Sequence, residues 1–118
     1  MDEYVELYKT GWSEWRTFPN PEKKEYIYAP YGAGVYQLRN RETQEFVLYG
    51  TGGNLAYRMS SLLPEPYGQG TRKNRGKREY VWKHIDKMEY RTIAFASKEM
   101  AKLFENYVKQ QEYYIFNT

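Results

Sequence analysis

The stretch Gly34–Arg58, GVYQLRNRETQEFVLYGTGGNLAYR, decides the fold that we expect for this chain. Residues Val35–Arg39 alternate between two faces as in a β-strand, and Glu45–Gly50 contains a run of strand-favouring residues. The polar residues 40–44 between these two segments predict a turn. The first half of the stretch is therefore predicted to be an antiparallel β-hairpin.

A glycine-rich loop and a helix are expected to follow the hairpin. Residues 50–53 read Gly-Thr-Gly-Gly, and Asn54 is a residue type that favours the N-cap of a helix. Apolar residues then recur at helical spacing, which predicts a helix over Leu55–Leu62. Arg58 is placed at the margin of the buried face of this helix.

The second half of the chain predicts two further helices and one further strand. We expect a helix over about Lys77–Lys87, a strand over Tyr90–Ala96, and a helix over about Lys98–Gln111 that Ser97 caps. The predicted buried arc of the last helix consists of Met100, Leu103, Phe104, Tyr107 and Val108. Glu105 lies just outside this arc. The predicted fold class is α+β, with a central three-stranded antiparallel sheet flanked by helices.

Residues 1–30 are predicted to be an aromatic-rich extension that packs on a domain formed by residues 31–118. The groups with helical spacing are Tyr4, Val5 and Tyr8, and then Trp12, Trp15 and Phe18. Each group therefore predicts a short helical segment. The alternative to a packed cover is a separate recognition element.

The composition limits the classes of function. At 118 residues the chain fits one compact domain. The absence of cysteine excludes disulfide scaffolds and thiolate sites, and the single histidine, His84, excludes a histidine-rich metal site within one chain. No apolar run approaches the roughly 20 residues that span a bilayer, and the acidic N-terminus does not resemble a signal peptide. We predict a cytoplasmic protein without a membrane partner.

Basic residues are concentrated in one segment. The formal net charge is only +3, but residues 72–78, RKNRGKR, contain five basic residues and no acidic one. Such a segment can bind nucleic-acid phosphates without sequence preference. The predicted nucleic-acid contacts are Arg72, Lys73, Arg75, Lys77 and Arg78. The alternative is a solvated surface loop.

The motifs of the hairpin and of the helix after it resemble those of the GIY-YIG nuclease domain. Gly34-Val35-Tyr36 stands where that family has its GIY motif, and Leu48-Tyr49-Gly50 stands where it has YIG. Residues 50–59, GTGGNLAYRM, are similar to the G-x-x-x-N-L-x-x-R-L run that follows in the family. Arg58 falls on the family arginine.

The resemblance continues to the C-terminal end. Residues 101–105 are similar to the A-x-x-x-E motif of the family's last helix, and Asn117 matches its terminal asparagine. The resemblance covers residues 31–118 and implies the GIY-YIG fold, with elements in the order β-β-α-α-β-α.

The resemblance implies a catalytic set of Tyr36, Tyr49, Arg58 and Glu105. Glu105 would bind one Mg²⁺ or Mn²⁺ ion that a DNA phosphate also ligates, because these cations prefer oxygen ligands. Arg58 would hold the phosphate through its planar donors. Tyr36 would orient or deprotonate the attacking water.

Two supporting residues and two departures complete the resemblance. Asn117 would fix the sheet edge or the catalytic glutamate by a hydrogen bond. His84 is a further candidate for a supporting residue, and the alternative is a helix-margin residue without a role in the site. Leu48 stands where the family has its second tyrosine, and Leu62 stands where many relatives have histidine or tyrosine. Because one step along a strand reverses the side-chain direction, Tyr49 can act only if a bulge or a changed register turns it.

The sequence therefore predicts a metal-dependent DNA endonuclease that hydrolyses phosphodiester bonds. Specificity would come from the basic segment, the extension, a homodimer or a partner protein. Two alternatives keep the fold: a catalytically weak or inactive DNA-binding module, and an RNA-cleaving toxin or defence component. Structural roles compete with the catalytic ones, since Tyr36 could be one more core tyrosine, Arg58 could cover the helix margin, and Glu105 could be solvated.

Overall fold

The decisive stretch forms the hairpin and the helix that its sequence predicts. In the computed structural model, β2 (Gly34–Asn40) pairs antiparallel with β3 (Phe46–Gly52), and α2 (Leu55–Ser60) begins directly after Asn54. The amide of Leu55 donates a hydrogen bond to the Gly32 carbonyl at 3.0 Å, which ties the start of α2 to the start of the hairpin. The structure describes residues 2–20, 23, 29, 32–60, 62 and 75–116.

The sheet contains one strand more than the sequence predicts. Its order is β1-β4-β2-β3 with antiparallel neighbours, where β4 spans Met88–Ala94 and β1 spans Arg16–Thr17. The predicted helical turn at Trp12–Phe18 and the three-stranded sheet are therefore wrong. Backbone hydrogen bonds to the edge of β4 favour an extended segment here over the helical turn that the side-chain spacing predicts. One of them runs from Phe18 N to Met88 O at 2.9 Å.

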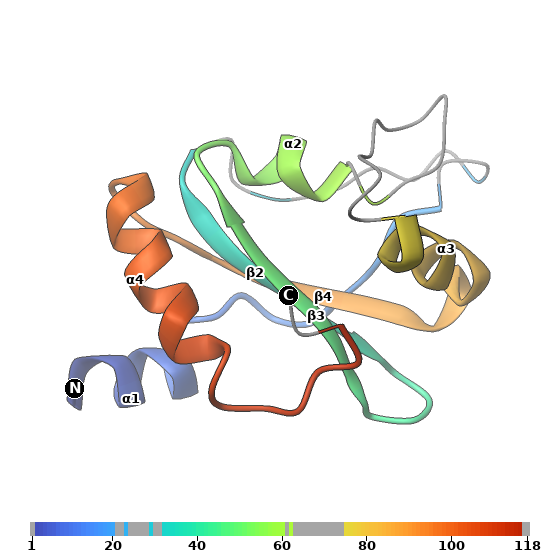
Figure 1. Cartoon of the computed structure of the whole chain (residues 1–118), viewed down its shortest axis with the longest axis horizontal. Coiled ribbons are helices and arrows are strands. Elements are labelled where there is room, and N and C mark those ends of the chain that lie inside the picture. The colour runs from blue at the N-terminus through green and yellow to red at the C-terminus, as the bar shows by residue number, and fades with distance from the viewer. Residues whose placement is uncertain are drawn as a thin grey trace.

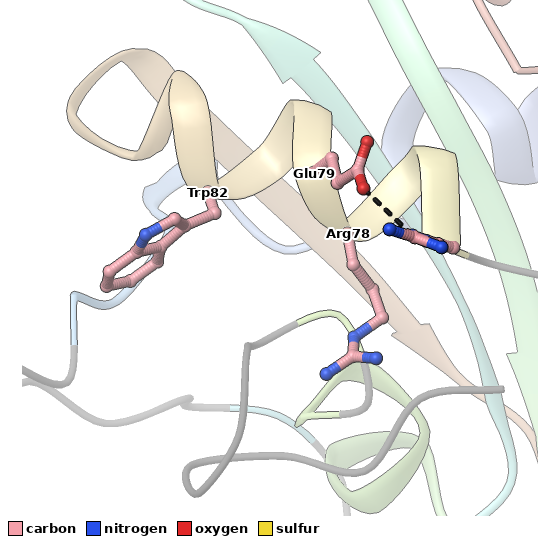
Figure 2. A pocket seen from close by; sticks show the side chains of 4 residues that line it. Arg78, Glu79 and Trp82 are labelled. Carbon is pink, nitrogen blue, oxygen red and sulfur yellow. Dashed lines mark hydrogen bonds and ion pairs between the residues drawn. The ribbon is translucent and has the colours of Figure 1, made fainter. Parts of the chain in front are cut away.

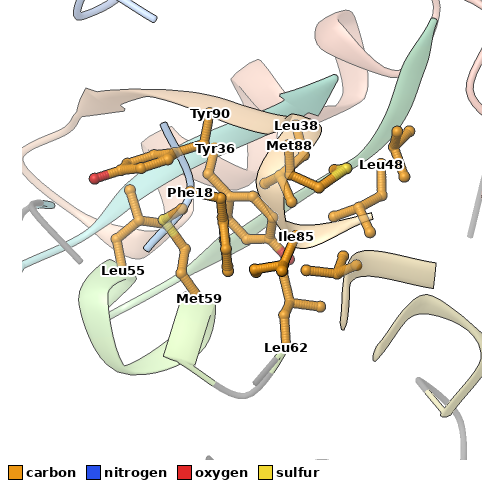
Figure 3. Close-up of a cluster of buried hydrophobic side chains, with 12 residues drawn as sticks. Phe18, Tyr36, Leu38, Leu48, Leu55, Met59, Leu62, Ile85, Met88 and Tyr90 are labelled. Carbon is orange, nitrogen blue, oxygen red and sulfur yellow. The ribbon is translucent and has the colours of Figure 1, made fainter. Parts of the chain in front are cut away.

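Two hydrophobic clusters lie on the two faces of the sheet. Figure 1 shows the sheet between the helices that cover these faces. The first cluster lies under α2, α3 (Arg75–Lys83) and the 3₁₀ helix Ile85–Lys87. The second lies under α1 (Asp2–Thr10) and α4 (Lys98–Val108). Figure 3 shows the first cluster, which includes Phe18, Tyr36, Leu38, Leu48, Leu55, Met59 and Tyr90.

The boundaries of α3 differ from the prediction at both ends. The helix starts at Arg75 and ends at Lys83, so that part of the basic segment is helical. The end predicted at about Lys87 is also different, because Ile85–Lys87 form a 3₁₀ helix and buried Met88 begins β4 directly after it. In the part of the chain that the structure describes, no helix combines the length and the apolar character needed to cross a membrane.

The last helix is capped as predicted but is rotated relative to the prediction. Ser97 Oγ accepts a hydrogen bond from the Met100 amide at 3.2 Å. The buried residues of α4 are Ala101, Phe104 and Val108, whereas Met100 and Leu103 are 50% and 58% exposed. The predicted burial of Met100 and Leu103 is therefore wrong. Small Ala101 faces the sheet, so the helix can approach it closely. In this orientation of α4 the neighbouring Glu105 is partly buried.

A β-bulge at Val47 sets which residues of β3 face each cluster. Leu38 pairs with Leu48, but the next residue of β2 pairs with Phe46, so Val47 is the extra residue. Val47 and Leu48 both lie in the first cluster, while Phe46 and Tyr49 lie with the second. The bulge therefore puts Phe46 on the face that α4 covers, together with Tyr49, whose direction the regular pairing with Gln37 sets.

A buried polar network joins the two ends of the chain to the centre of the sheet. Gln37 is fully buried, and its amide nitrogen donates to the hydroxyl groups of Tyr114 at 2.7 Å and Tyr8 at 3.0 Å. Its amide oxygen accepts from Arg91 Nε at 2.7 Å, and Tyr8 donates to Glu112 at 2.7 Å. The network fixes α1 and the C-terminal segment on the same face of β2.

We predict that Gln37→Leu destabilises the fold strongly. The substitution removes the acceptor of Arg91 Nε and the amide that donates to Tyr8 and Tyr114, whose hydroxyl groups keep their hydrogen bonds to Glu112 and to the Val108 carbonyl. A buried polar group left unsatisfied costs about 1–3 kcal/mol. Urea unfolding should show a loss of at least about 2 kcal/mol in the free energy of unfolding. The exposed control Gln110→Leu should change it by no more than about 0.5 kcal/mol. Equal stability of the two variants would contradict the role of the network.

Candidate active site

The ring of Tyr36 lies over Gly50 on the neighbouring strand. The two residues are paired in the β2–β3 register, and a Cβ atom built on Gly50 would lie 2.4 Å from Tyr36 Oη and 2.5 Å from its Cζ. These distances are too short for real atoms, so glycine is required at this position. The glycine of the second motif therefore provides the space for the tyrosine of the first. Because β3 is the edge strand, the phenol extends toward the edge of the sheet.

Arg58 of α2 lies beside the end of β3. A Cβ atom on Gly52 would lie 3.2 Å from Arg58 Cβ, so α2 passes closely over the strand end. Burial raises the pKa of Tyr36 to about 12, Arg58 acts in the opposite direction, and Glu105 adds to the increase. The guanidinium and the carboxylate thus both lie within electrostatic reach of the phenol.

Glu105 brings a carboxylate from α4 to the same edge. Partial burial raises the pKa of this carboxyl group, and nearby cations act in the opposite direction. In order of effect these cations are Lys102, Arg58, Lys109 and Lys77. Two of them are neighbours on α4, but Arg58 and Lys77 come from α2 and α3. Glu105 is therefore part of a site built by several elements and is not a solvated helix residue.

Lys77 belongs to this site as well. The sequence predicts it as a phosphate contact at the start of a helix, and the structure places it in the first turn of α3, where it is partly buried. Burial lowers the pKa of Lys77, Arg58 lowers it further, and Glu105 raises it. The ammonium group therefore faces the same guanidinium and carboxylate as the phenol of Tyr36.

The C-terminal segment holds α3 close to this edge of the sheet. Ile115 N donates to Phe46 O at 3.1 Å and Phe116 N donates to Val47 O at 2.9 Å, so the segment runs along β3. The ring of Phe116 lies 5.7 Å from the ring of Tyr80 on α3. The start of α3, and Lys77 with it, is thereby packed beside the edge strand.

Tyr49 lies on the opposite face of β3 from Tyr36. It pairs with Gln37, and its ring centroid is 4.6 Å from that of Tyr114 in the second cluster. The bulge does not turn it toward Tyr36. Burial raises the pKa of Tyr49 and Glu105 raises it further, so the Tyr49 hydroxyl borders the carboxylate from the α4 side. The predicted catalytic residues therefore do not share one face of the sheet. Tyr36 and Tyr49 lie on opposite faces of β3, and Glu105 is within electrostatic reach of both.

The two departures from the family pattern are core residues in this structure. Leu48 is fully buried and Leu62 is 2% exposed, and both belong to the first hydrophobic cluster. Neither position presents a hydroxyl or an imidazole group to the sheet edge. Any chemistry at this edge therefore depends on the remaining polar groups.

The other predicted site residues lie on or directly after α3, or fall outside the described residues. Arg75 and Arg78 lie on α3, and His84 follows this helix with its ring centroid 4.4 Å from that of Tyr80. The structure thus packs His84 against an aromatic ring at the far end of α3 from Lys77. The predictions for Arg72, Lys73 and Asn117 fall outside the described residues.

A metal ion fits this site only in one binding mode. Within residues 2–20, 32–60, 75–116 and the few single residues described, no group of three or more His, Cys, Asp or Glu side chains could hold a metal ion. Mg²⁺ is commonly bound by one or two carboxylates together with substrate phosphates and water. The partly buried carboxylate of Glu105 suits that mode and does not suit a cage made by protein ligands alone.

Two features of the site were not predicted from the sequence. One is the place of Lys77, which lies four residues before buried Val81 and so on the inner side of α3. The helix predicted to start at about Lys77 contains both residues, so this spacing is the signal that could have indicated the burial of Lys77. The other is the contact of Tyr36 with Gly50, which depends on the strand register and has no local signal.

The arrangement combines a phenol, a guanidinium, an ammonium and a carboxylate group at one edge of a sheet. Such a set can bind a phosphate through its cations and position a water molecule beside it. Comparison of the chain with protein-family models, with curated proteins and with solved structures gives no match. The function is therefore argued from the residues themselves.

We predict that Gly50→Ala displaces the Tyr36 ring. The added methyl group would overlap the phenol, and such overpacking typically costs about 1–3 kcal/mol. Urea unfolding of the variant measures this loss. Gly32→Ala is the matched control, because a Cβ atom there meets no atom within 4 Å. A Gly50→Ala protein as stable as the control would show that the ring does not lie over this glycine.

We predict that Glu105→Gln stabilises the protein increasingly as the pH rises. Burial raises the folded-state pKa of Glu105 above the ordinary value of a glutamate, so the fold disfavours the ionised form. The wild type therefore loses stability as the pH rises through the folded pKa, whereas glutamine does not ionise. Chemical unfolding between about pH 4 and pH 8 should show a growing advantage of the variant. The control is Glu99→Gln, in the exposed first turn of α4, which should show no such advantage. A difference in unfolding free energy between Glu105→Gln and the wild type that does not change with pH would refute the burial of the charge.

Proposed function

We propose that the chain is a metal-dependent DNA endonuclease with an active site of the GIY-YIG type. One arrangement carries this proposal: the Tyr36 ring lies over Gly50, Arg58 of α2 lies beside Gly52 at the end of the same strand, and Glu105 of α4 is within electrostatic reach of both. These are residues that the sequence motifs single out, and they are far apart along the chain. Their proximity at one sheet edge is expected of a phosphate-processing site and is not required by the packing of the core.

The cations of the site would bind the DNA backbone. The guanidinium of Arg58 offers planar donors that match phosphate oxygens, and Lys77 adds a second positive charge on the same side. Arg75 and Arg78 lie in the first turn of α3, whose N-terminal end also favours negative charge. Neighbouring phosphates of the same strand would therefore be held along the start of α3.

The pKa of Tyr36 bears on the two roles expected for it. Burial raises this pKa to about 12, so the phenol is protonated at neutral pH when no cation is bound beside it. In that state Tyr36 would donate a hydrogen bond to a phosphate oxygen or orient the attacking water, and a bound cation would have to lower its pKa for it to act as the base. In the hydrolysis, the oxygen of one water bonds to phosphorus and the bond from phosphorus to the sugar oxygen breaks, which leaves a phosphate end and a hydroxyl end.

Glu105 would supply the protein ligand for a divalent cation. A bound Mg²⁺ or Mn²⁺ ion would stabilise negative charge on the phosphate and make a bound water more acidic. The carboxylate is held partly buried on α4, with Tyr36 and Tyr49 on either side of β3. Tyr49 would then position this carboxylate and would not contact the phosphate that Tyr36 faces.

A second candidate function is a DNA-binding module without catalytic activity. Leu48 and Leu62 favour it, because both are core residues at positions where the family pattern has polar side chains. The cations of the proposed site would still bind phosphates in such a module. Cleavage assays separate the two functions.

We predict that the wild type nicks supercoiled plasmid DNA with Mg²⁺ or Mn²⁺ and that Glu105→Gln lowers the rate by at least about a hundredfold. The reason is the loss of the carboxylate that would hold the cation. Glu99→Gln keeps the same net charge as Glu105→Gln and alters an exposed position of the same helix, so it should nick at the wild-type rate. Chelation of the metal should abolish nicking by both active proteins.

Two outcomes would contradict the endonuclease. Absence of nicking by the wild type under conditions where it binds the plasmid would leave the DNA-binding module as the function. Cleavage of RNA with no cleavage of DNA of the same sequence would assign the site to RNA, and the two substrates are therefore compared side by side.

A further inference from the structure

A cavity of about 220 Å³ lies on one face of α3, apart from the groups that act on Tyr36. Its described lining residues are Arg75, Arg78, Glu79 and Trp82. These positions are three, four and seven residues apart, the spacing of one helical face. Figure 2 shows Arg78 and Trp82 extending from the same side of the helix. The described lining of the cavity therefore belongs to one helix.

Trp82 gives this cavity an aromatic wall that the core holds in place. Its side chain packs against the first hydrophobic cluster and is only partly buried, so that part of the indole ring faces the cavity. A tryptophan fixed in this way can stack on a planar ring without losing further side-chain freedom. The wall therefore suits a planar heteroaromatic ligand.

The polar groups around Trp82 add charge of both signs. Arg75 Nε and Glu79 Oε1 form an ion pair of 3.0 Å in which both side chains are exposed. Exposed pairs of this kind are weak, so a ligand can exchange with either partner. The arginines suit the phosphate of a nucleotide, and the carboxylate can accept a hydrogen bond from an amino group of a base.

The position and size of the cavity favour one nucleotide over a duplex. Lys77, which faces Glu105 and Arg58, directly precedes Arg78, so α3 links the candidate active site to the cavity. The volume equals that of about seven water molecules, which is room for a single ring system. A base that is stacked and paired within a duplex cannot present its face to Trp82, whereas an unpaired base can.

We propose that the α3 cavity binds one unpaired nucleobase next to the cleaved phosphate, stacked on Trp82. This inference rests on the proposed function for its DNA substrate, and it names the substrate class as DNA that contains an unpaired nucleotide. The basic first turn of α3 holds the backbone on either side of that nucleotide. Fully paired DNA then binds through its phosphates alone.

The test compares two labelled hairpin duplexes that differ only in one bulged nucleotide. Binding to the wild-type chain is measured by fluorescence anisotropy in EDTA, so that cleavage plays no part. The bulged duplex should bind about five- to a hundredfold more tightly, which is the range expected for one base stacked on an aromatic side chain. Its binding should also quench tryptophan fluorescence, a readout that needs no substitution at Trp82.

Substitutions of two tryptophans then test whether Trp82 causes the preference for the bulged duplex. Trp82→Leu should remove the preference for the bulge and leave the affinity for paired DNA unchanged, while Trp82→Phe should keep part of it. Trp15→Phe is the control, because Trp15 packs against Phe46 and Arg39 and lines no part of the cavity described here. Equal affinity for both duplexes, or a preference that survives Trp82→Leu, would overturn the proposal.

The outcomes separate this proposal from the endonuclease itself. A protein that nicks paired plasmid and shows no preference for the bulge is a nuclease without this subsite. A protein that prefers the bulge through Trp82 and nicks no DNA has the subsite, and the nuclease proposal then fails alone. Binding of a bulged RNA through Trp82 without binding of the bulged DNA would overturn the assignment to DNA.

Discussion

The contact between the Tyr36 ring and Gly50 is the constraint on which the candidate site depends. It requires the β2–β3 register in which these residues are opposite, and it requires a strand position without a side chain. A shift of one residue would turn Tyr36 to the other face of the sheet. The bulge at Val47 lies beyond this contact and leaves that register intact. The hairpin therefore fixes the direction of the Tyr36 phenol toward the edge of the sheet.

The surrounding helices complete the site at some cost in stability. α4 rests on Ala101 and so buries part of Glu105, whose ionised form the fold disfavours. Lys77 is likewise partly buried and its pKa is lowered. Partly buried charges of opposite sign on separate elements stabilise a fold poorly, which is typical of residues retained for chemistry. The hydrophobic clusters on both faces of the sheet supply the stability that tolerates this arrangement.

Local signals in the sequence were sufficient for the hairpin, for the start of α2 and for the Ser97 cap, because alternation, glycine and capping act over a few residues. The short strand β1 carries no such signal, since it forms only where β4 offers an unpaired edge. The rotation of α4 was missed because Met100 and Leu103 are hydrophobic, yet the sheet contacts the small Ala101 instead. The motifs single out Tyr36, Arg58 and Glu105, and strand alternation already indicates that Tyr49 faces away from Tyr36 unless a bulge turns it. The approach of Lys77 to Glu105 depends on tertiary packing.

The most direct test of the central claim, that Tyr36 and Arg58 act together on one phosphate, is a double-mutant cycle of single-turnover nicking rates. Tyr36→Phe, Arg58→Lys and the double variant are compared with the wild type at saturating protein. If both residues act on one phosphate, each single change should slow nicking and the double variant should lose far less than the product of the two losses, because residues of one catalytic unit are not additive. Losses that multiply, or a single variant that nicks at the wild-type rate, would contradict a shared site.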